Sequence, residues 1–193
     1  DLKYRGGVAP VIVGHDTTLR EYVTIHMPTA PVGVTRVGHH CNILAYSHVA
    51  HDCLVGDHVI MSNSTNLGGH VVVEDRVVMG GLIGVHQFVR IGRMCMVGAC
   101  SKVAQDLPPF MLADGNPAMP RAINKIGMQR NGCSDASIRE ATHAFRLIYR
   151  SGVALEAALD ALSGDYPESS EIEQMTAFIR GSERGIARPR ERD

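Results

Sequence analysis

The chain has 193 residues, and its 19 basic and 20 acidic side chains give a formal net charge of −1 at pH 7. This length suits one domain with a small appendage, and the lack of a basic bias argues against binding to duplex nucleic acid. No uninterrupted apolar stretch approaches the roughly eighteen residues that indicate a membrane span, and the first residues do not read as a signal peptide. Five cysteines without a CxxC pair are typical of reduced thiols, so we expect a cytoplasmic protein.

A six-residue repeat is the longest regular feature. From Val37 to Pro108 the chain divides into twelve consecutive hexads, beginning VGHHCN, ILAYSH and VAHDCL. The first position is always aliphatic or Met, and the fifth is small, β-branched or aliphatic. Since residues two apart in a strand face the same side, the fifth position and the next first position both point into one narrow core. A helix would need a period near 3.6, so the repeat predicts a parallel β-solenoid with three hexads in each coil.

The same phase extends N-terminally through VGHDTT, LREYVT and IHMPTA, residues 13–30. The segment around Pro28 and Pro31 is a poor strand, so we expect it to leave the solenoid as a loop. After Pro108 the repeat stops, and the Pro-rich residues 108–124 are expected to form a last irregular coil. We therefore predict a β-helix over residues 1–116 and a C-terminal segment with a helical domain over 117–193.

Three helices are expected in the C-terminal part. The first covers residues 134–151, with Ser134 as its N-cap. Its apolar face is expected to comprise Ile138, Ala141, Phe145 and Ile148. The second covers 152–164 and the third 169–182, whereas the arginine-rich tail, 183–193, is expected to be frayed.

The three-hexad coil places residues eighteen apart on top of one another, about 4.8 Å apart. His51 then stacks with Gly69 and Gln87, and Asp52 stacks with His70. His86 stacks with Gly68 and Ala50. We therefore expect five polar side chains at outward positions to converge on one corner of three adjacent coils: His51, Asp52, His70, His86 and Gln87.

Two kinds of chemistry compete for this corner. A solitary outward histidine is usually only solvated, and corner glycines usually serve the turn, but the gathering of these groups favours a site. Histidines beside an aspartate suit zinc. Alternatively, one histidine acts as a general base while the aspartate holds its ring in the right tautomer.

At these residues the sequence resembles the family of acyl-[acyl-carrier-protein]–UDP-N-acetylglucosamine O-acyltransferases, hexapeptide-repeat enzymes of lipid A biosynthesis. The matching stretches are DLKY, VTIH, HVAHDC, GGHV, VHQF, VGACSKVAQDLPPF, GNPA and FRLIYRSG. The resemblance implies a mainly β fold, a left-handed parallel β-helix with a C-terminal α-helical domain. It also implies a homotrimer with active sites in clefts between subunits. The reaction implied is transfer of a 3-hydroxyacyl chain from an acyl carrier protein thioester to the sugar 3-hydroxyl of UDP-N-acetylglucosamine. No metal or diffusible cofactor takes part, because the donor is the phosphopantetheine thioester of the carrier protein.

The resemblance also implies residue roles. His51 is the general base, Asp52 orients and polarises its ring, and the backbone N–H of Gly69 stabilises the tetrahedral oxyanion. The implied substrate-binding residues are Asp1 and Lys3 at the glucosamine end, His48, His70 and Gln87 around the sugar and thioester, His86 in the same cleft, and Asn124 and Arg130 at the nucleotide and its phosphates. Ala99 matches the position that ends the acyl-chain groove and so measures chain length.

Two departures from the family pattern concern the nucleotide contacts and the chain start. Ile126 and Asn131 stand where the family often has an acidic residue and a second arginine. The family's chain also begins several coils earlier, so the sequence is expected to lack the N-terminal coils.

Other readings stay open at this point. A γ-type carbonic anhydrase would hold zinc through His48, His51 and His70 across a subunit interface. A related hexapeptide N-acyltransferase shares the solenoid and a base histidine, but its tail differs from FRLIYRSG. A purely structural solenoid predicts no gathering of polar residues on one corner. If the acyltransferase reading is right, the acidic carrier protein is expected to dock on Arg139, Arg146 and Arg150.

Overall fold

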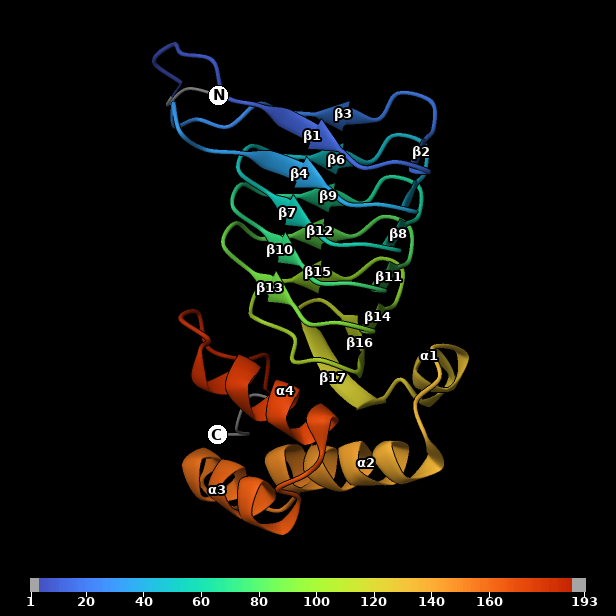
Figure 1. Ribbon diagram of the computed structural model, residues 1–193, viewed down its shortest axis with the longest axis vertical. Coiled ribbons are helices and arrows are strands. Elements are labelled where there is room, and N and C mark those ends of the chain that lie inside the picture. Colours follow the sequence, from blue (N-terminus) through green and yellow to red (C-terminus); the bar gives the residue numbers. More distant parts are fainter. Residues whose placement is uncertain (1–3, 189–193) are drawn as a thin grey trace.

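The computed structural model describes residues 4–188, in which a parallel β-helix stands on a group of four helices (Figure 1). Three sheets run along the β-helix. Sheet A contains β1 (Val11–Val13), β4 (Thr35–Val37), β7 (Leu54–Val55), β10 (Val72–Val73) and β13 (Arg90–Ile91). Sheet B contains β2 (Thr18–Leu19), β5 (Asn42–Ile43), β8 (Ile60–Met61), β11 (Val78–Met79), β14 (Met96–Val97), β16 (Met111–Gly115) and β17 (Ala118–Ile123). Sheet C contains β3 (Thr24–Ile25), β6 (His48–Val49), β9 (Asn66–Leu67), β12 (Gly84–Val85) and β15 (Lys102–Val103).

The chain visits the three sheets in the order A, B, C, which gives the β-helix three corners. We call them the A–B, B–C and C–A corners after the strands that they join. For the strand pairs from β4 to β15, paired residues in neighbouring coils are eighteen apart, as in Val55 with Val73, whereas β14 pairs with β16 at an offset of sixteen, as in Met96 with Leu112. The predicted period of three hexads is therefore confirmed.

The core of the β-helix follows the predicted hexad positions. Every first-position residue from Val37 to Val103 and every fifth-position residue from Cys41 to Leu107 is buried. Full burial of a side chain of the size of Val or Ile contributes about 1.5–3 kcal/mol. The polar fifth positions are satisfied by the backbone, since the hydroxyl of Thr65 donates to the carbonyl of Gly80 at 2.8 Å and that of Ser47 to the carbonyl of Ser62 at 3.1 Å.

The corners place side chains in outward columns. One residue at each corner has a left-handed backbone, with φ of 60° at both Asp52 and His70. Such a conformation costs a non-glycine residue about 1–2 kcal/mol. The continuous ladder offsets that cost, because the N–H of His70 donates to the carbonyl of His51 at 3.0 Å across the corner.

A loop interrupts the first coil at its C–A corner, as expected from Pro28 and Pro31. Val11 pairs with Thr35, an offset of 24 residues rather than eighteen, so the loop between β3 and β4 carries six extra residues. This insertion lies directly against the corner that holds His51.

The end of the β-helix differs from the sequence-based expectation. Instead of an irregular coil, β16 and β17 form an antiparallel pair with a bulge between Leu112 and Ala113. This pair continues sheet B and covers the last coil of the β-helix, which would otherwise present an unpaired edge.

Four helices follow this pair at the lower end of the molecule as drawn (Figure 1). They are α1 (Lys125–Arg130), α2 (Asp135–Arg150), α3 (Leu155–Asp165) and α4 (Ser170–Arg180). In Figure 1, α1 lies beside β17, and α2 and α3 lie below it. The three predicted helices correspond to α2, α3 and α4, and Ser134 caps α2 by accepting from the N–H of Ser137. Short α1 was not predicted. Among the described residues, no helix combines the length and apolar character needed to cross a bilayer.

The first part of the tail is anchored, which contradicts the expectation that it is frayed. Ile186 and Ala187 are buried, and the N–H of Ala187 donates to the carbonyl of Asp106 at 2.8 Å. Arg184 donates to the carbonyl of Ala104 at 3.2 Å. These contacts tie the tail to the last coil, and burial of the two apolar side chains explains why a segment rich in charge is ordered.

Candidate active site

His51 and Asp52 form a hydrogen-bonded pair at the C–A corner that follows β6. Nδ1 of His51 lies 2.9 Å from Oδ2 of Asp52, and the two side chains are only 13% and 10% exposed. Both occupy outward hexad positions, so their low exposure comes from neighbouring coils and not from the core. The corner therefore shields a polar pair without placing it inside the β-helix.

The inserted loop holds the carboxylate of Asp52. Oδ2 accepts hydrogen bonds from the backbone N–H of Thr29 at 3.0 Å and from its hydroxyl at 2.9 Å. The N–H of Asp52 donates to the hydroxyl of Thr35 at 2.8 Å. Gly33 lies so close that an added Cβ would stand 2.6 Å from Oδ1 of Asp52. The loop can pack here only because that position is a glycine.

These contacts set the charge state of Asp52. Burial by itself raises the pKa of this carboxyl, but the hydrogen bonds from Thr29 and His51 outweigh burial and hold the pKa below its ordinary value. An ionised carboxylate only accepts hydrogen bonds, so the proton shared with His51 belongs to Nδ1 of the imidazole. In neutral His51 the other nitrogen, Nε2, then carries a lone pair that can take a proton.

The ring of His51 lies over Gly69 of the next coil. A Cβ added to Gly69 would stand 2.4 Å from Cε1 and 2.5 Å from Nε2 of the imidazole, so only glycine leaves room for the ring. Within residues 4–188, the backbone N–H of Gly69 has no hydrogen-bond acceptor. At the A–B corner, by contrast, carboxylates accept from the corner N–H groups: Asp57 from His39 and Asp75 from Asp57, both at 2.8 Å. Among the described residues, the N–H of Gly69 is therefore left without an acceptor, at a position close to Nε2 of His51.

Two more histidines border the pair. His70 stands with Nε2 3.8 Å from Oδ2 of Asp52, and its ring stacks on Phe88 at 4.7 Å. His48 accepts or donates a hydrogen bond through Nδ1 to the hydroxyl of Thr24 at 2.7 Å. Burial, with a smaller contribution from nearby positive charge, lowers the pKa of His48. His48 therefore adds a neutral imidazole on sheet C, next to the polar side chains of the C–A corner.

The structure places the predicted site residues at three separate places: the C–A corner, the B–C corner and the sheet B side of the β-helix. His51, Asp52, Gly69 and His70 are brought together, and exposed His86 and Gln87 follow one coil below at the same corner, where Nδ1 of His86 lies 3.1 Å from the carbonyl of Gln87. Ala99 is exposed at the B–C corner, between β14 and β15. Asp1 and Lys3 lie outside the described residues.

Asn124 and Arg130 belong to a groove on the sheet B side, not to the corner of His51. The groove has a volume of about 650 Å³. Asn124 caps α1 by accepting from the N–H of Gly127 at 3.0 Å, and it donates to the carbonyl of Met94 at 2.8 Å. Asn131 accepts from the guanidinium of Arg76 at 2.8 Å. The groove wall includes His40, Asn42, His58, Ile60, Arg76, Asn124, Ile126, Arg130 and Asn131.

Metal-ligating groups come together at two places within the described residues. One is His51, Asp52 and His70, and the other is His15, Asp16 and His40, each with ligand atoms within 4.8 Å of one another. His48 belongs to neither group. The zinc reading based on His48, His51 and His70 therefore lacks a ready three-histidine cluster within one chain.

Sequence reasoning missed the residues that support the pair, Thr29, Gly33 and Thr35, and it missed Thr24, which is hydrogen-bonded to His48. A signal for two of them, Thr29 and Gly33, was available in the insertion itself. A loop that interrupts a regular repeat is commonly functional, and this one falls on the coil next to HVAHDC.

Comparison with known proteins points to one family. A family profile described as "Udp N-acetylglucosamine O-acyltransferase; Domain 2" matches residues 106–187. The acyl-[acyl-carrier-protein]–UDP-N-acetylglucosamine O-acyltransferase of Paracidovorax citrulli is 48% identical, with 97% of this chain and 74% of that protein covered. The proteins of the same name from Synechocystis sp. and Gloeothece citriformis are 46% and 42% identical, with 84% and 94% of this chain covered. This chain spans 59% and 66% of the length of those two relatives.

Solved structures agree with the sequence matches. LpxA from Acinetobacter baumannii superposes with a TM-score of 0.93 at 36% identity, covering 97% of this chain and 74% of that one. The UDP-N-acetylglucosamine acyltransferase of Arabidopsis superposes with a TM-score of 0.91 at 35% identity, covering 97% and 69%. The expected fold, a parallel β-helix with a helical C-terminal domain, is confirmed.

Proposed function

Because the chain belongs to the family of acyl-[acyl-carrier-protein]–UDP-N-acetylglucosamine O-acyltransferases, we propose that it carries the catalytic corner of such an enzyme. The proposed reaction moves a 3-hydroxyacyl chain from an acyl carrier protein thioester to the 3-hydroxyl of the sugar, the first step of lipid A biosynthesis. The hydrogen-bonded pair of His51 and Asp52, with its ring over Gly69, is the observation that carries this proposal.

The proposed chemistry begins at the sugar hydroxyl. Nε2 of His51 takes its proton while the oxygen attacks the thioester carbon, and ionised Asp52 stabilises the imidazolium that forms. The carbonyl oxygen becomes an oxyanion, which accepts a hydrogen bond from the N–H of Gly69. When the C–S bond breaks, His51 returns the proton to the leaving thiolate. The products are the sugar ester and the free thiol of the carrier protein.

We further propose that the complete site lies between subunits of a homotrimer. Within one chain the base, the groove of Asn124 and Arg130, and Ala99 lie on different sides of a three-sided β-helix. A substrate that contacts all of them must therefore bridge two chains, with His51 from one subunit and the groove from its neighbour. In that cleft, Asp1 and Lys3 are proposed to contact the glucosamine end of the substrate. His48, His70 and Gln87 are proposed to lie around the sugar and the thioester, with His86 beside them.

The competing zinc enzyme makes a different demand on the same corner. It needs an ion on His48, His51 and His70, but His48 lies outside the group of His51, Asp52 and His70 whose ligand atoms come within 4.8 Å of one another. The acyl-transfer mechanism uses no metal. Acyl transfer should therefore survive prior treatment with a chelator, and loss of turnover that zinc restores would favour the metal enzyme.

The central test replaces the base. His51→Ala should lower turnover by roughly 10²–10⁴-fold, the usual contribution of general base catalysis. The measurement is formation of the acylated sugar nucleotide from UDP-N-acetylglucosamine and 3-hydroxyacyl carrier protein, detected by mass. Because the side chain lies outside the core, melting temperature and oligomeric state should stay unchanged. A variant that keeps the parental rate would refute the assignment of His51.

A further inference from the structure

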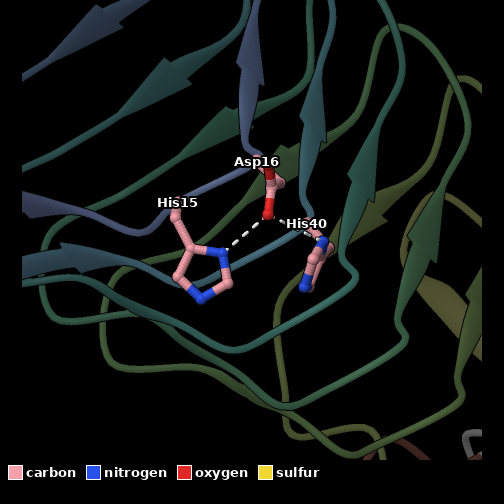
Figure 2. Close-up of side chains that lie close together, drawn as sticks. All are labelled: His15, Asp16 and His40. Carbon is pink, nitrogen blue, oxygen red and sulfur yellow. Dashed lines mark hydrogen bonds and ion pairs between the residues drawn. The ribbon is translucent and has the colours of Figure 1, made fainter.

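A second cluster of imidazole and carboxylate groups lies at the A–B corner of the first two coils. His15 and Asp16 follow β1, and His40 follows β4. Figure 2 shows the carboxylate of Asp16 between the two rings. Oδ2 of Asp16 lies 2.8 Å from Nδ1 of His15 and 3.7 Å from Nδ1 of His40. The proposed acyl transfer assigns no task to His15 or Asp16, and His40 also lines the groove of Asn124 and Arg130.

We propose that His15, Asp16 and His40 bind one divalent transition-metal ion, of the zinc and copper class. Two imidazole nitrogens and one carboxylate oxygen suit these ions, whereas magnesium and calcium prefer oxygen ligands alone. Two ligand atoms of one tetrahedral zinc ion stand about 3.3–3.6 Å apart, given bonds of about 2.0–2.2 Å. The observed separations of 2.8 and 3.7 Å lie on either side of that range.

The backbone beneath the cluster is fixed, while its side chains can still adjust. The N–H of His40 donates to the carbonyl of His15 at 3.1 Å, and the hydroxyl of Thr17 donates to the carbonyl of Gly38 at 2.7 Å. The side chains of His15, Asp16 and His40 are 65%, 67% and 45% exposed. Small rotations can therefore bring the three ligand atoms from within 4.8 Å of one another to the spacing of a bound ion.

Two neighbouring histidines orient the proposed ligands. The ring of His58 stacks on that of His40 at 4.9 Å and 12°. Nδ1 of His39 accepts from the backbone N–H of His15 at 3.0 Å, and the rings of His15 and His39 lie 4.0 Å apart. Such outer contacts are what hold metal-binding imidazoles in place.

A bound ion would tie the first coil to the second. His15 and Asp16 belong to one coil and His40 to the next, so the ion would bridge the corner next to β1. An ion that binds only the folded form shifts the equilibrium toward that form, and local opening of residues 11–19 should become rarer.

Metal binding by the full chain, purified without a histidine tag and stripped with a chelator, tests the proposal. Equilibrium dialysis against micromolar Zn(II) should show one equivalent of metal bound per parent chain. Co(II) absorption serves as the spectroscopic probe of the same binding. Asp16→Asn and His40→Gln should weaken that binding at least tenfold, since each removes a ligand. Asp52→Asn, at the other cluster, should leave it in place and serves as the matched control.

Three results would overturn the proposal. The first is that the folded parent binds no metal ion at micromolar concentration. The second is that Asp16→Asn and His40→Gln both bind the metal with the affinity of the parent. The third is that only Asp52→Asn loses the bound metal. Hydrogen exchange gives an independent readout. Zn(II) should slow exchange of the amides of residues 11–19 in the parent and not in Asp16→Asn, and unchanged exchange in the zinc-treated parent would refute the bridge between coils.

Discussion

Thr29 is the residue on which the charge of Asp52 most directly depends. Its hydroxyl and its N–H both donate to the same carboxylate oxygen, and a hydrogen bond to a charged group contributes about 1.5–3 kcal/mol. This contact stabilises the ionised form of Asp52, and ionised Asp52 in turn holds the proton of His51 on Nδ1. Thr29 is therefore a positioning residue that acts through Asp52.

The substitution Thr29→Val removes the hydroxyl donor and keeps the shape and the N–H. The depressed pKa of Asp52 should then rise toward its ordinary value, so activity should begin to fall at a higher pH as the solution is acidified. We expect kcat to drop about tenfold with KM nearly unchanged. Thr29→Ser keeps both donors and should behave like the parent in the same pH profile. Identical profiles for the valine and serine variants would remove Thr29 from the mechanism.

Gly69 tests the position of the imidazole. In Gly69→Ala the new Cβ would meet Cε1 and Nε2 of His51 at distances that no real contact shows, so the ring must turn away from its place. We expect turnover to fall nearly as far as in His51→Ala, with the melting temperature preserved because the strain falls on one outward side chain. Gly164→Ala, where an added Cβ meets nothing within 4 Å, is the matched control. Parental turnover in Gly69→Ala would contradict this arrangement.

The pair at this corner was predictable from the sequence, whereas its support was not. His51 and Asp52 are adjacent in the chain, and the period of eighteen residues places Gly69 and His70 on the next coil. Thr29 and Gly33 lie in the insertion, where the repeat gives no register. Their approach to Asp52 depends on how the loop folds back, which no periodicity encodes. The same reasoning explains why sequence alone could not place Asn124, whose position depends on the unpredicted helix α1.

At the scale of elements, periodicity predicted most of the fold and failed where the chain reverses direction. The hexads located the strands because the fifth and first positions must both be buried. Ser134 and the apolar face with Ile138 and Phe145 located α2 for the same kind of reason. The antiparallel pair of β16 and β17 follows the last hexad, where a six-residue period no longer applies and where three prolines suggested irregular structure.

Helix α2 carries a prediction about the carrier protein. Arg139, Arg146 and Arg150 are all exposed, but their surroundings differ. The guanidinium of Arg150 lies 5.2 Å above the ring of Phe145 and donates to the carbonyl of Arg121 at 3.2 Å. Changing Arg150 would therefore disturb packing as well as charge, and Arg146 is the cleaner test.

Charge reversal in Arg146→Glu should raise the KM for acyl carrier protein without changing kcat. The increase should be larger at low salt, because screening weakens exposed charge contacts. Kinetics with a small acyl-phosphopantetheine donor provide the control, since a donor without the acidic protein should show no change in KM. An unchanged KM for the carrier protein at low salt, in a folded variant, would exclude Arg146 from the docking surface.

At the scale of the whole molecule, the three-sided shape separates the residues that are proposed to contact one substrate. His51 lies at the C–A corner, the groove with Arg130 on the sheet B side, and Ala99 at the B–C corner. A rigid solenoid has no hinge that could bring these sides together within one chain. Packing of neighbouring β-helices side by side can do so, because the corner of one chain then faces the sheet of the next.

Ala99 carries the prediction that depends most on such packing. Its side chain is exposed and stands in a column with Ala45, Asn63 and Gly81, a line of small or modest residues along one corner. If an acyl chain lies along this column in the cleft between subunits, the volume at Ala99 sets how many methylenes fit. Each buried methylene contributes about 0.8 kcal/mol, so excluding one changes selectivity by about fourfold.

Ala99→Met should therefore shift the preference toward shorter acyl chains by several carbons, and Ala99→Gly should shift it toward longer ones. Competition among 3-hydroxyacyl carrier proteins of different length, with products separated by mass, measures the preference directly. Both substitutions lie outside the core, so turnover with the best substrate of each variant should remain close to that of the parent and serves as the control for folding. If both variants keep the parental preference, the acyl chain ends elsewhere in the cleft and Ala99 is only a small corner residue.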